Sequence, residues 1–323
     1  MMRAAVRAQL HATRNAGARR LLHASVAPLA AERLSGGVGN TGVGKDWAGH
    51  GKSSWDSDTQ TFHAGQDWMQ LTQDGIFIED FSVTTNAFGT PKGAEEAAAK
   101  ACSLMHHYPP ADFEPALTDL AKFLWPEGHE EGHSRLLMGN GASELIDLVI
   151  RDGPIGTWKP AGVHDLLGGT VQYKEYERSA EAAGHMQVDA GTPGAALTCC
   201  VNPNNPTGGY RPLPEMMQYI EQNCEDGSHV IVDESMQPWV GPNWREDSLI
   251  SVGDWAAELE KSRGISVFVM HSWTKLWACP GVRLGSVVAP SAATLKRVKA
   301  KQVPWSVNLM AIDFTSAVRV SAT

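Results

Sequence analysis

Three short runs of apolar residues place the strongest constraint on how this chain can fold. They are ALTCCV (196–201), HVIVD (229–233) and ISVFVM (265–270), and β-branched side chains recur in them. Runs that are apolar at almost every position are typical of parallel strands that are buried on both faces of a sheet. RLLM (135–138) predicts a further, shorter strand.

Segments with helical spacing alternate with these strands. The predicted helices cover 93–107, 112–124, 142–150, 173–184, 213–224 and 248–262. This alternation predicts an α/β fold, a mostly parallel open sheet with helices on both faces. In such a fold, ligands bind beyond the carboxyl ends of the strands.

The composition narrows the class of protein. The 323 residues are 42% hydrophobic and 20% charged, which predicts an ordinary globular protein. No apolar run approaches the roughly 18 residues that a membrane span needs. Without its first 31 residues the chain carries 27 − 5 = 22 basic and 36 acidic side chains, a balance of −14. A body this acidic argues against nucleic acid as the main partner. The five cysteines show no CxxC pair, which predicts reduced thiols.

The first 31 residues differ from the rest. They contain five arginines but no acidic residue, and Glu32 is the first carboxylate. An arginine-rich, acid-free start is typical of an organelle transit peptide, which here favours the mitochondrion, with the plastid as the other destination. The alternative is a basic tail that binds nucleic acid. Residues 32–79 are rich in Gly, Ser and Asp without periodicity, and we expect a linker or an N-terminal arm there.

Two segments resemble known motifs but depart from them at a decisive position. In VGNTGVGKD (38–46), Asp46 stands where a nucleotide-binding loop has Ser or Thr, and its carboxylate would repel phosphate. HEEGH (129–133) matches the zinc-protease pattern H-E-x-x-H, which works only on a helix. A proline and two glycines within 126–132 predict that no helix forms there. We therefore expect a solvated loop and no metal site.

Polar residues follow each of the three apolar strands. NPNNPTGGY (202–210) follows the first, VDES (232–235) ends the second, and HSWTKLWACPGVRLG (271–285) follows the third. An amide, a carboxylate, a lysine and an arginine should therefore meet at one edge of the sheet. A pyridoxal phosphate site needs these groups. The lysine holds the cofactor, the carboxylate keeps its pyridine nitrogen protonated, the amide bonds its phenolic oxygen, and the arginine neutralises its phosphate.

In this order the motifs resemble those of the fold-type I pyridoxal-phosphate aminotransferases. The family's N-P-x-N-P-T-G stands at 202–208, its D-E at 233–234, its S-x-[ST]-K at 272–275 and its P-G-x-R-x-G at 280–285. The resemblance covers residues 80–323 and implies the large domain of that fold.

The resemblance implies roles for the residues that match. Lys275 would carry the cofactor and move protons, and Asp233 would pair with the pyridinium nitrogen. Asn205 would bond the phenolic oxygen. Tyr173 falls near the aromatic residue that stacks on the ring, although 154–172 shows neither the strand nor the proline that the family has before this aromatic.

The cofactor phosphate is expected at the start of a helix. GNGASELIDLVI (139–150) presents the backbone N–H groups of Ala142 and Ser143 next to glycines. Unpaired donors and the helix dipole favour an anion at such a position. The resemblance implies that the phosphate lies on this turn, with Ser272 and Arg283 completing its contacts.

A finer resemblance points to one branch of the family. DFSVTTNAFGTPKG (80–93), YPPADFEPALTDLAKFL (108–124) and PWSVN (304–308) look like histidinol-phosphate aminotransferase and threonine-phosphate decarboxylase. Both act on amino compounds that bear a phosphate ester, and PWSVN leans towards the decarboxylase. Tyr108 matches a tyrosine that in the family reaches the partner subunit's cofactor phosphate, which implies a homodimer. The alternative is a tyrosine that only covers a helix start.

Two departures from the family pattern bear on function. Met236 stands where many relatives have a tyrosine that bonds the phenolic oxygen, so the tuning of the cofactor would differ. The chain stops at Thr323 within a predicted helix, whereas relatives continue into a small domain with the arginine that grips the substrate carboxylate. We therefore expect an incomplete small domain, and cofactor binding with little turnover from these 323 residues.

The expected function is that of a pyridoxal-phosphate-dependent aminotransferase. It would transfer an amino group between an amino acid or a histidinol-phosphate-like amino phosphate ester and a 2-oxo acid. One alternative is decarboxylation of threonine phosphate, and another is cofactor binding without turnover. The expected partners are small molecules and a second copy of the chain, not a membrane or nucleic acid.

Overall fold

The computed structural model describes residues 83–162 and 171–321, with side chains up to Val318. From Thr84 onward these residues form one unit, distinct from Met1–Val83. The predictions for the transit peptide (1–31), for the linker or arm (32–79) and for the glycine-rich motif within it lie outside the described residues.

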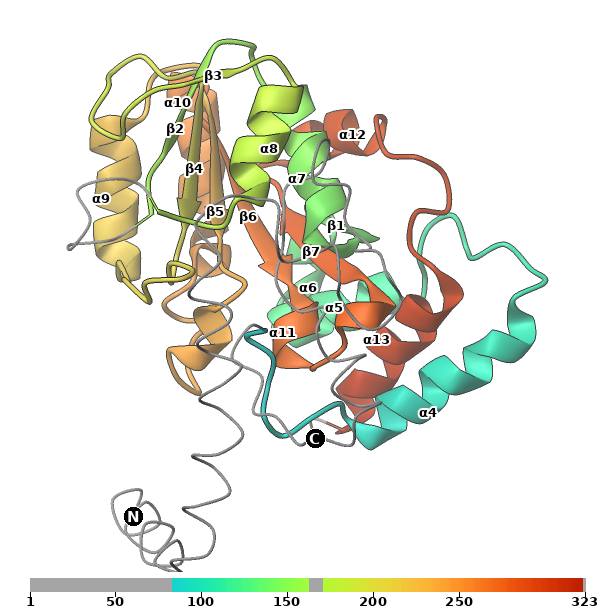
Figure 1. Cartoon of the computed structure of the whole chain (residues 1–323). Helices are drawn as coiled ribbons and strands as arrows, with labels where there is room; N and C mark the ends of the chain where they lie inside the picture. Colours follow the sequence, from blue (N-terminus) through green and yellow to red (C-terminus); the bar gives the residue numbers. More distant parts are fainter. Residues whose placement is uncertain (1–82, 163–170, 322–323) are drawn as a thin grey trace, which may run out of the picture. The chain divides into compact units, whose positions relative to one another are not determined.

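A seven-stranded sheet forms the centre of the described part of the chain (Figure 1). Its strands are β1 (Leu136–Asn140), β2 (Thr157–Pro160), β3 (Met186–Gln187), β4 (Leu197–Val201), β5 (His229–Asp233), β6 (Ser266–Ser272) and β7 (Leu284–Val288). Their order across the sheet is β1-β7-β6-β5-β4-β2-β3. β7 runs antiparallel to both its neighbours, and the other pairings are parallel. The predicted mostly parallel α/β sheet is confirmed.

The register of the parallel strands brings their carboxyl ends to one edge of the sheet. Val201, at the end of β4, pairs with Asp233 at the end of β5. Asp233 pairs in turn with Met270, two residues before β6 ends at Ser272. β4 and β5 are buried at every position, as expected of strands covered on both faces. Residues that follow these strands are consequently held next to one another.

Helices lie on both sides of the sheet, with α9 on one side and α7 and α8 on the other (Figure 1). The α-helices are α4 (Lys92–Ala101), α5 (Ala116–Leu124), α6 (His129–His133), α7 (Gly141–Asp152), α8 (Glu175–Ala182), α9 (Leu213–Asn223), α10 (Gly253–Arg263), α11 (Trp273–Leu276), α12 (Ala292–Lys299) and α13 (Leu309–Ser321). Short 3-10 helices are η2 (Cys102–Leu104), η3 (Gln237–Trp239), η4 (Leu249–Val252) and η5 (Pro280–Val282). α7 packs on β1, β6 and β7 through a buried face that includes Leu145, Ile146 and Val149. None of the described helices has the length and apolar character that crossing a membrane requires.

β2 contradicts one expectation from the sequence. No strand is predicted within 154–172, yet Thr157–Pro160 forms β2 between β3 and β4. Its sequence, TWKP, includes a lysine and a proline, and these hide the apolar pattern of a buried strand. Lys159 is nevertheless buried, because its Nζ donates hydrogen bonds to the carbonyl oxygens of Thr192 (3.2 Å) and Asn223 (2.7 Å).

The HEEGH segment also departs from its prediction, because it forms the short helix α6. A glycine with a φ of 71° precedes the helix and allows a sharp start. Gly132 is needed for packing, since a Cβ there would lie 2.3 Å from the ring of Trp125. The glycines therefore permit this helix, and the prediction that they interrupt it is wrong. His133 Nε2 lies 3.1 Å from Glu114 Oε1, and the described residues contain no group of three or more potential metal ligands.

Candidate active site

One pocket gathers the polar residues that follow the parallel strands, and we call it the strand-end pocket. Its lining residues are Ala142, Ser143, Tyr173, Val201, Asn205, Asp233, Ser235, Met236, Ser272, Lys275 and Arg283. They come from the start of α7, the segment before α8, the ends of β4, β5 and β6 with the segments that follow, and the residue directly before β7. The structure thus brings together every predicted site residue except Tyr108.

Asp233 is the buried acid of this pocket. It ends β5, and only 4% of its surface is exposed. Its Oδ2 accepts a hydrogen bond from Tyr176 Oη at 2.9 Å, and its Oδ1 accepts one from the backbone N–H of Ser235 at 2.9 Å. Burial raises the pKa of Asp233, whereas these hydrogen bonds and the charge of Lys275 oppose the rise. The carboxylate is therefore held in one orientation next to a cation.

Lys275 is the amine of the pocket. It lies in the one-turn helix α11, which begins where β6 ends. Its Nζ donates a hydrogen bond to Thr274 Oγ1 at 3.2 Å. Burial lowers the pKa of Lys275; Asp233 opposes this shift, and the positive charge of Arg283 adds to it. A lowered pKa increases the neutral fraction of the amine, which is the form that attacks a carbonyl carbon.

The amino terminus of α7 forms a cradle for an anion. α7 begins at Gly141, so the backbone N–H groups of Ala142 and Ser143 are among those without a partner inside the helix. Gly141 has a φ of 75°, and a Cβ there would lie 2.3 Å from Nη2 of Arg283. Gly285 of β7 also packs closely, since its Cβ would lie 2.5 Å from the backbone nitrogen of Ala142. The helix start and the guanidinium together favour a phosphate group.

Asn205, Tyr173 and Met236 complete the walls of the pocket. Asn205 lies in the loop after β4. This loop is fixed by the side chain of Asn202. Its Nδ2 donates a hydrogen bond to the carbonyl oxygen of Arg211 at 2.8 Å, and its Oδ1 accepts one from the backbone N–H of Arg211 at 2.8 Å. Burial raises the pKa of the Tyr173 phenol. Met236 contributes an apolar thioether, so the polar contacts on this wall come from Asn205 and from the tyrosine.

Tyr108 lies elsewhere. It follows η2 in the connection between α4 and α5, and 76% of its surface is exposed. Its ring stacks on that of Trp305, with the centroids 4.5 Å apart. Trp305 belongs to the PWSVN segment, so two segments singled out separately from the sequence meet at the surface. Within one chain, Tyr108 does not line the strand-end pocket.

Two contributors to the site were not identified from the sequence. Tyr176 is fully buried, and its ring meets that of Tyr173 edge-on, with the centroids 6.3 Å apart. Ser235 Oγ accepts a hydrogen bond from the backbone N–H of Ser272 at 2.7 Å, which ties the end of β5 to the end of β6. The available signals were a second tyrosine one helical turn after the first, and a serine directly after the Asp-Glu pair.

Comparison with known proteins identifies the family. The sequence pattern of "Aminotransferase class I and II" matches residues 78–320. The chain belongs to this family. It is 29% identical to threonine-phosphate decarboxylase from Salmonella typhimurium over 247 residues, which cover 72% of this chain and 62% of the relative. It is 26% identical to histidinol-phosphate aminotransferase 2 from Ralstonia nicotianae over 236 residues, which cover 70% of this chain and 59% of the relative. The chain therefore spans about three fifths of the length of these curated relatives.

Solved structures confirm the fold of this class I and II aminotransferase chain. Histidinol-phosphate aminotransferase from Sinorhizobium meliloti, in complex with pyridoxal-5'-phosphate, superposes with a TM-score of 0.64 at 16% identity, covering 82% of this chain and 70% of that one. The corresponding enzyme from Clostridium acetobutylicum gives a TM-score of 0.60 at 21% identity, covering 76% and 70%. The predicted fold-type I architecture is therefore correct.

Proposed function

We propose that this protein is a pyridoxal-phosphate-dependent aminotransferase acting on an amino acid or an amino phosphate ester and a 2-oxo acid. The observation that carries the proposal is the content of the strand-end pocket. A buried carboxylate and an amine of lowered pKa lie in one pocket with an anion cradle. These features suit the pyridine nitrogen, the aldehyde and the phosphate of this cofactor. Membership of the class I and II aminotransferases supports the same conclusion.

The residues of the pocket fit the cofactor. The close approach of Arg283 to the start of α7, which the absence of a Cβ at Gly141 allows, suits its phosphate. Asp233 receives a hydrogen bond on each carboxylate oxygen, which stabilises the charged form that a protonated pyridine requires. When bound, the cofactor would supply an electron-withdrawing ring that stabilises negative charge on the substrate Cα.

Lys275 would hold the cofactor and move the proton. As a neutral amine it would take the Cα proton of the amino substrate as a general base, and the resulting ammonium would give up a proton again as a general acid. Its lowered pKa suits both steps, because burial disfavours the charged ammonium form. Tyr173 would cover one face of the ring, and Asn205 would orient its phenolic oxygen.

The substrate class rests on the relatives. Both threonine-phosphate decarboxylase and histidinol-phosphate aminotransferase are named for amino compounds that bear a phosphate ester. We propose a substrate of this kind, with transamination as the reaction. Decarboxylation of threonine phosphate is the second candidate, and the relative at 29% identity favours it. Binding of the cofactor without turnover is the third.

The experiment that separates these candidates uses purified protein supplied with pyridoxal phosphate. It is incubated with histidinol phosphate plus 2-oxoglutarate, and separately with threonine phosphate. Formation of glutamate supports the aminotransferase. Release of CO₂ from threonine phosphate without amino transfer replaces it with the decarboxylase. A bound cofactor with neither product establishes the third candidate, and Lys275→Ala is the control that should give neither product.

We propose that the active form is a homodimer in which Tyr108 reaches the phosphate cradle of the partner. Its high exposure and its position outside the strand-end pocket support a contact with another molecule. Subunits carrying Tyr108→Phe are mixed with subunits carrying Lys275→Ala. If the site is shared, a mixed dimer contains one complete site, with Lys275 from the Tyr108→Phe subunit and Tyr108 from the Lys275→Ala subunit. Such a mixed dimer should recover activity. Activity no greater than that of the parents would contradict the proposal.

We also propose that residues 1–31 direct the protein to the mitochondrion, where they are removed. The basis is the arginine-rich, acid-free composition of this segment. N-terminal sequencing of the native protein from a purified mitochondrial fraction tests this. An intact Met1 in a cytosolic fraction would contradict it.

A further inference from the structure

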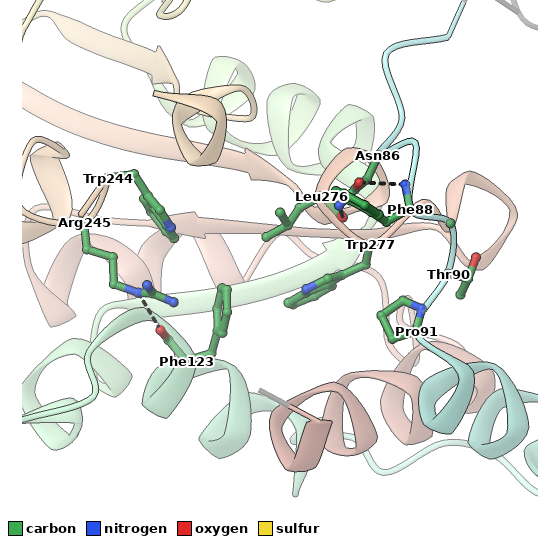
Figure 2. A pocket seen from close by; sticks show the side chains of 10 residues that line it. Asn86, Phe88, Thr90, Pro91, Phe123, Trp244, Arg245, Leu276 and Trp277 are labelled. Atoms are coloured by element: carbon green, nitrogen blue, oxygen red, sulfur yellow. Dashed lines mark hydrogen bonds between the residues drawn. The ribbon is translucent and has the colours of Figure 1, made fainter. Parts of the chain in front are cut away.

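A second pocket, with a volume of about 450 Å³, lies apart from the strand-end pocket, and we call it the aromatic pocket. Its lining residues include Asn86, Phe88, Phe123, Trp244, Arg245 and Trp277, and none of its lining residues is shared with the strand-end pocket. Figure 2 shows Trp244 and Arg245 on one side and Asn86 and Phe88 on the other, with Phe123 and Trp277 between them. The volume falls in the range of small-molecule sites, about 300–1,000 Å³.

Arg245 is the one charged side chain among the described residues that line this pocket. Its guanidinium carbon lies 4.5 Å from the ring centroid of Phe123 and 4.6 Å from that of Trp244, which is cation–π geometry on two sides. Its Nε donates a hydrogen bond to the carbonyl oxygen of Phe123 at 2.8 Å. Within residues 83–162 and 171–318, no carboxylate pairs with this guanidinium. Burial lowers the pKa of Arg245, and no acidic group in the described part of the chain opposes the shift.

The aromatic walls are fixed by their own packing. Phe123 meets Trp273 edge-on, with centroids 5.6 Å apart, and Trp277 at 5.3 Å. Trp273 and Trp277 stack on each other at 5.2 Å. A ligand would therefore meet surfaces that are already in place, which reduces the entropy lost on binding.

Asn86 and Thr90, which also line this pocket, already have hydrogen-bond partners. Asn86 Nδ2 donates to the carbonyl oxygen of Leu276 at 3.0 Å, and Asn86 Oδ1 accepts from the backbone N–H of Phe88 at 3.0 Å. Thr90 Oγ1 donates to the carbonyl oxygen of Ala278 at 2.7 Å. Among the described lining residues, the terminal nitrogens of Arg245 are the charged donors available for recognition, and the indole N–H groups of Trp244 and Trp277 are neutral ones.

The geometry points to a binding site for a small carboxylic acid with a flat aromatic body. The carboxylate accepts two parallel hydrogen bonds from Nη1 and Nη2 of Arg245, which is the bidentate arrangement that a guanidinium favours. The ring of the acid lies against the half-buried Phe123 and the largely buried Trp277. Phe88, which is 99% exposed at the rim, loses water contact when the ligand is present. The ligand is expected to be an acid because the described residues give the half-buried Arg245 no counter-charge, so an anion stabilises it most.

The test compares 3-phenylpropionate with its uncharged amide, 3-phenylpropionamide, by calorimetric titration of the purified protein. The acid is expected to bind at least tenfold more tightly than the amide, because hydrogen bonds between charged groups are the stronger ones. Arg245→Met should weaken binding of the acid about ten- to a hundredfold, and Arg245→Lys should weaken it less. The matched control is Arg151→Met, which removes an exposed arginine outside both pockets and should leave the affinity within twofold.

Three other results would contradict the inference. Equal binding of the acid and the amide would show that the guanidinium does not recognise the ligand. An affinity lowered by Arg283→Met and unchanged by Arg245→Met would place the acid in the strand-end pocket instead. If no binding is detected at millimolar concentrations of the acid, the aromatic pocket does not bind such acids. If Arg245→Met fails to fold, as judged by its melting curve, the acid–amide comparison on the unaltered protein and the Arg245→Lys variant still decide. The experiment measures no turnover, so its result is independent of the proposed aminotransferase activity.

Discussion

The strand-end pocket and the aromatic pocket are built from the same chain in different ways. The strand-end pocket takes most of its side chains from the ends of β4, β5 and β6, where strand register sets them side by side, and completes its walls with the start of α7 and the residues before α8 and β7. The aromatic pocket takes its side chains from the end of α5, the loop after η3, the segment after α11 and the segment before α4. One is positioned by backbone pairing, and the other by the packing of rings.

The difference shows in how charge is handled. In the strand-end pocket, Asp233, Lys275 and Arg283 influence one another, and each carboxylate oxygen of Asp233 has a hydrogen-bond donor. In the aromatic pocket, Arg245 has aromatic faces and one carbonyl oxygen as its described partners. A charged network suits chemistry on a bound cofactor, whereas a single cation among rings suits the binding of an anion. Substitution of Arg245, which lines the aromatic pocket and not the strand-end pocket, should therefore leave cofactor binding unaffected.

The largest effect is expected from Gly285→Ala. The new Cβ would lie 2.5 Å from the backbone nitrogen of Ala142 and 2.7 Å from the carbonyl carbon of Gly141, so the start of α7 must shift. We expect a loss of about a hundredfold in affinity for pyridoxal phosphate and a lower melting temperature. Gly281→Ala is the matched control, because its Cβ would meet nothing within 4 Å. Equal cofactor affinity in the two variants would refute the cradle at the start of α7.

The next effect is expected from Arg283→Met, which removes the cation from the anion cradle. Affinity for pyridoxal phosphate should fall about thirtyfold, because a charge-assisted hydrogen bond is lost. Affinity for pyridoxal, which has no phosphate, should change little. Equilibrium dialysis with both compounds measures the two effects. An equal loss for both would mean that Arg283 acts on the fold rather than on the phosphate.

A smaller effect is expected from Tyr176→Phe, which deletes the hydroxyl that donates to Asp233 Oδ2. Because this bond holds down the pKa of Asp233, its loss should raise that pKa. Cofactor affinity should fall about fivefold at neutral pH, and the loss of affinity on acidification should begin at a higher pH. Tyr219→Phe, outside the pocket, is the control. An unchanged pH profile in Tyr176→Phe would show that the hydroxyl serves packing alone.

The smallest effect concerns the pH at which Lys275 becomes reactive. Burial lowers the pKa of Lys275 below the ordinary 10.5. At a given pH the neutral fraction of this amine is therefore larger in the folded protein than in the unfolded chain, and stability falls as the pH drops from the unfolded-state pKa towards the lower folded-state pKa. Modification by pyridoxal, followed over pH and compared with that of a blocked free lysine, should reach its midpoint at a lower pH for Lys275. A midpoint at or above that of the free lysine would contradict the stated environment.

The strands at the centre of the sheet could be predicted because burial on both faces leaves a continuous apolar pattern. β4, β5 and β6 show this pattern. β2 does not, since Lys159 is buried by hydrogen bonds to two carbonyl oxygens that are distant in sequence. The short helix α6 was also missed. Its Gly132 predicts a break in the helix, but the glycine makes room for the ring of Trp125, a packing contact that the local sequence does not show.

Most residues of the strand-end pocket could be predicted because they stand in motifs next to strands, although Ser235 was missed. Tyr176 could not, because its partner Asp233 lies 57 residues away and on another element. The aromatic pocket could not be predicted either. Arg245 and Phe123 are 122 residues apart, and no local pattern marks either one for the other. Sequence motifs therefore identified the groups set by strand ends, but not those set by packing between distant segments.

The central claim is that Lys275 holds pyridoxal phosphate. The direct measurement is to add the cofactor to purified protein, reduce it with borohydride and map the labelled peptide by mass spectrometry, with Lys275→Ala as the control. The account predicts one label, on Lys275 in the segment 272–283, and none at that position in the control. A label on another lysine in its place, or no label on Lys275 despite bound cofactor, would contradict it.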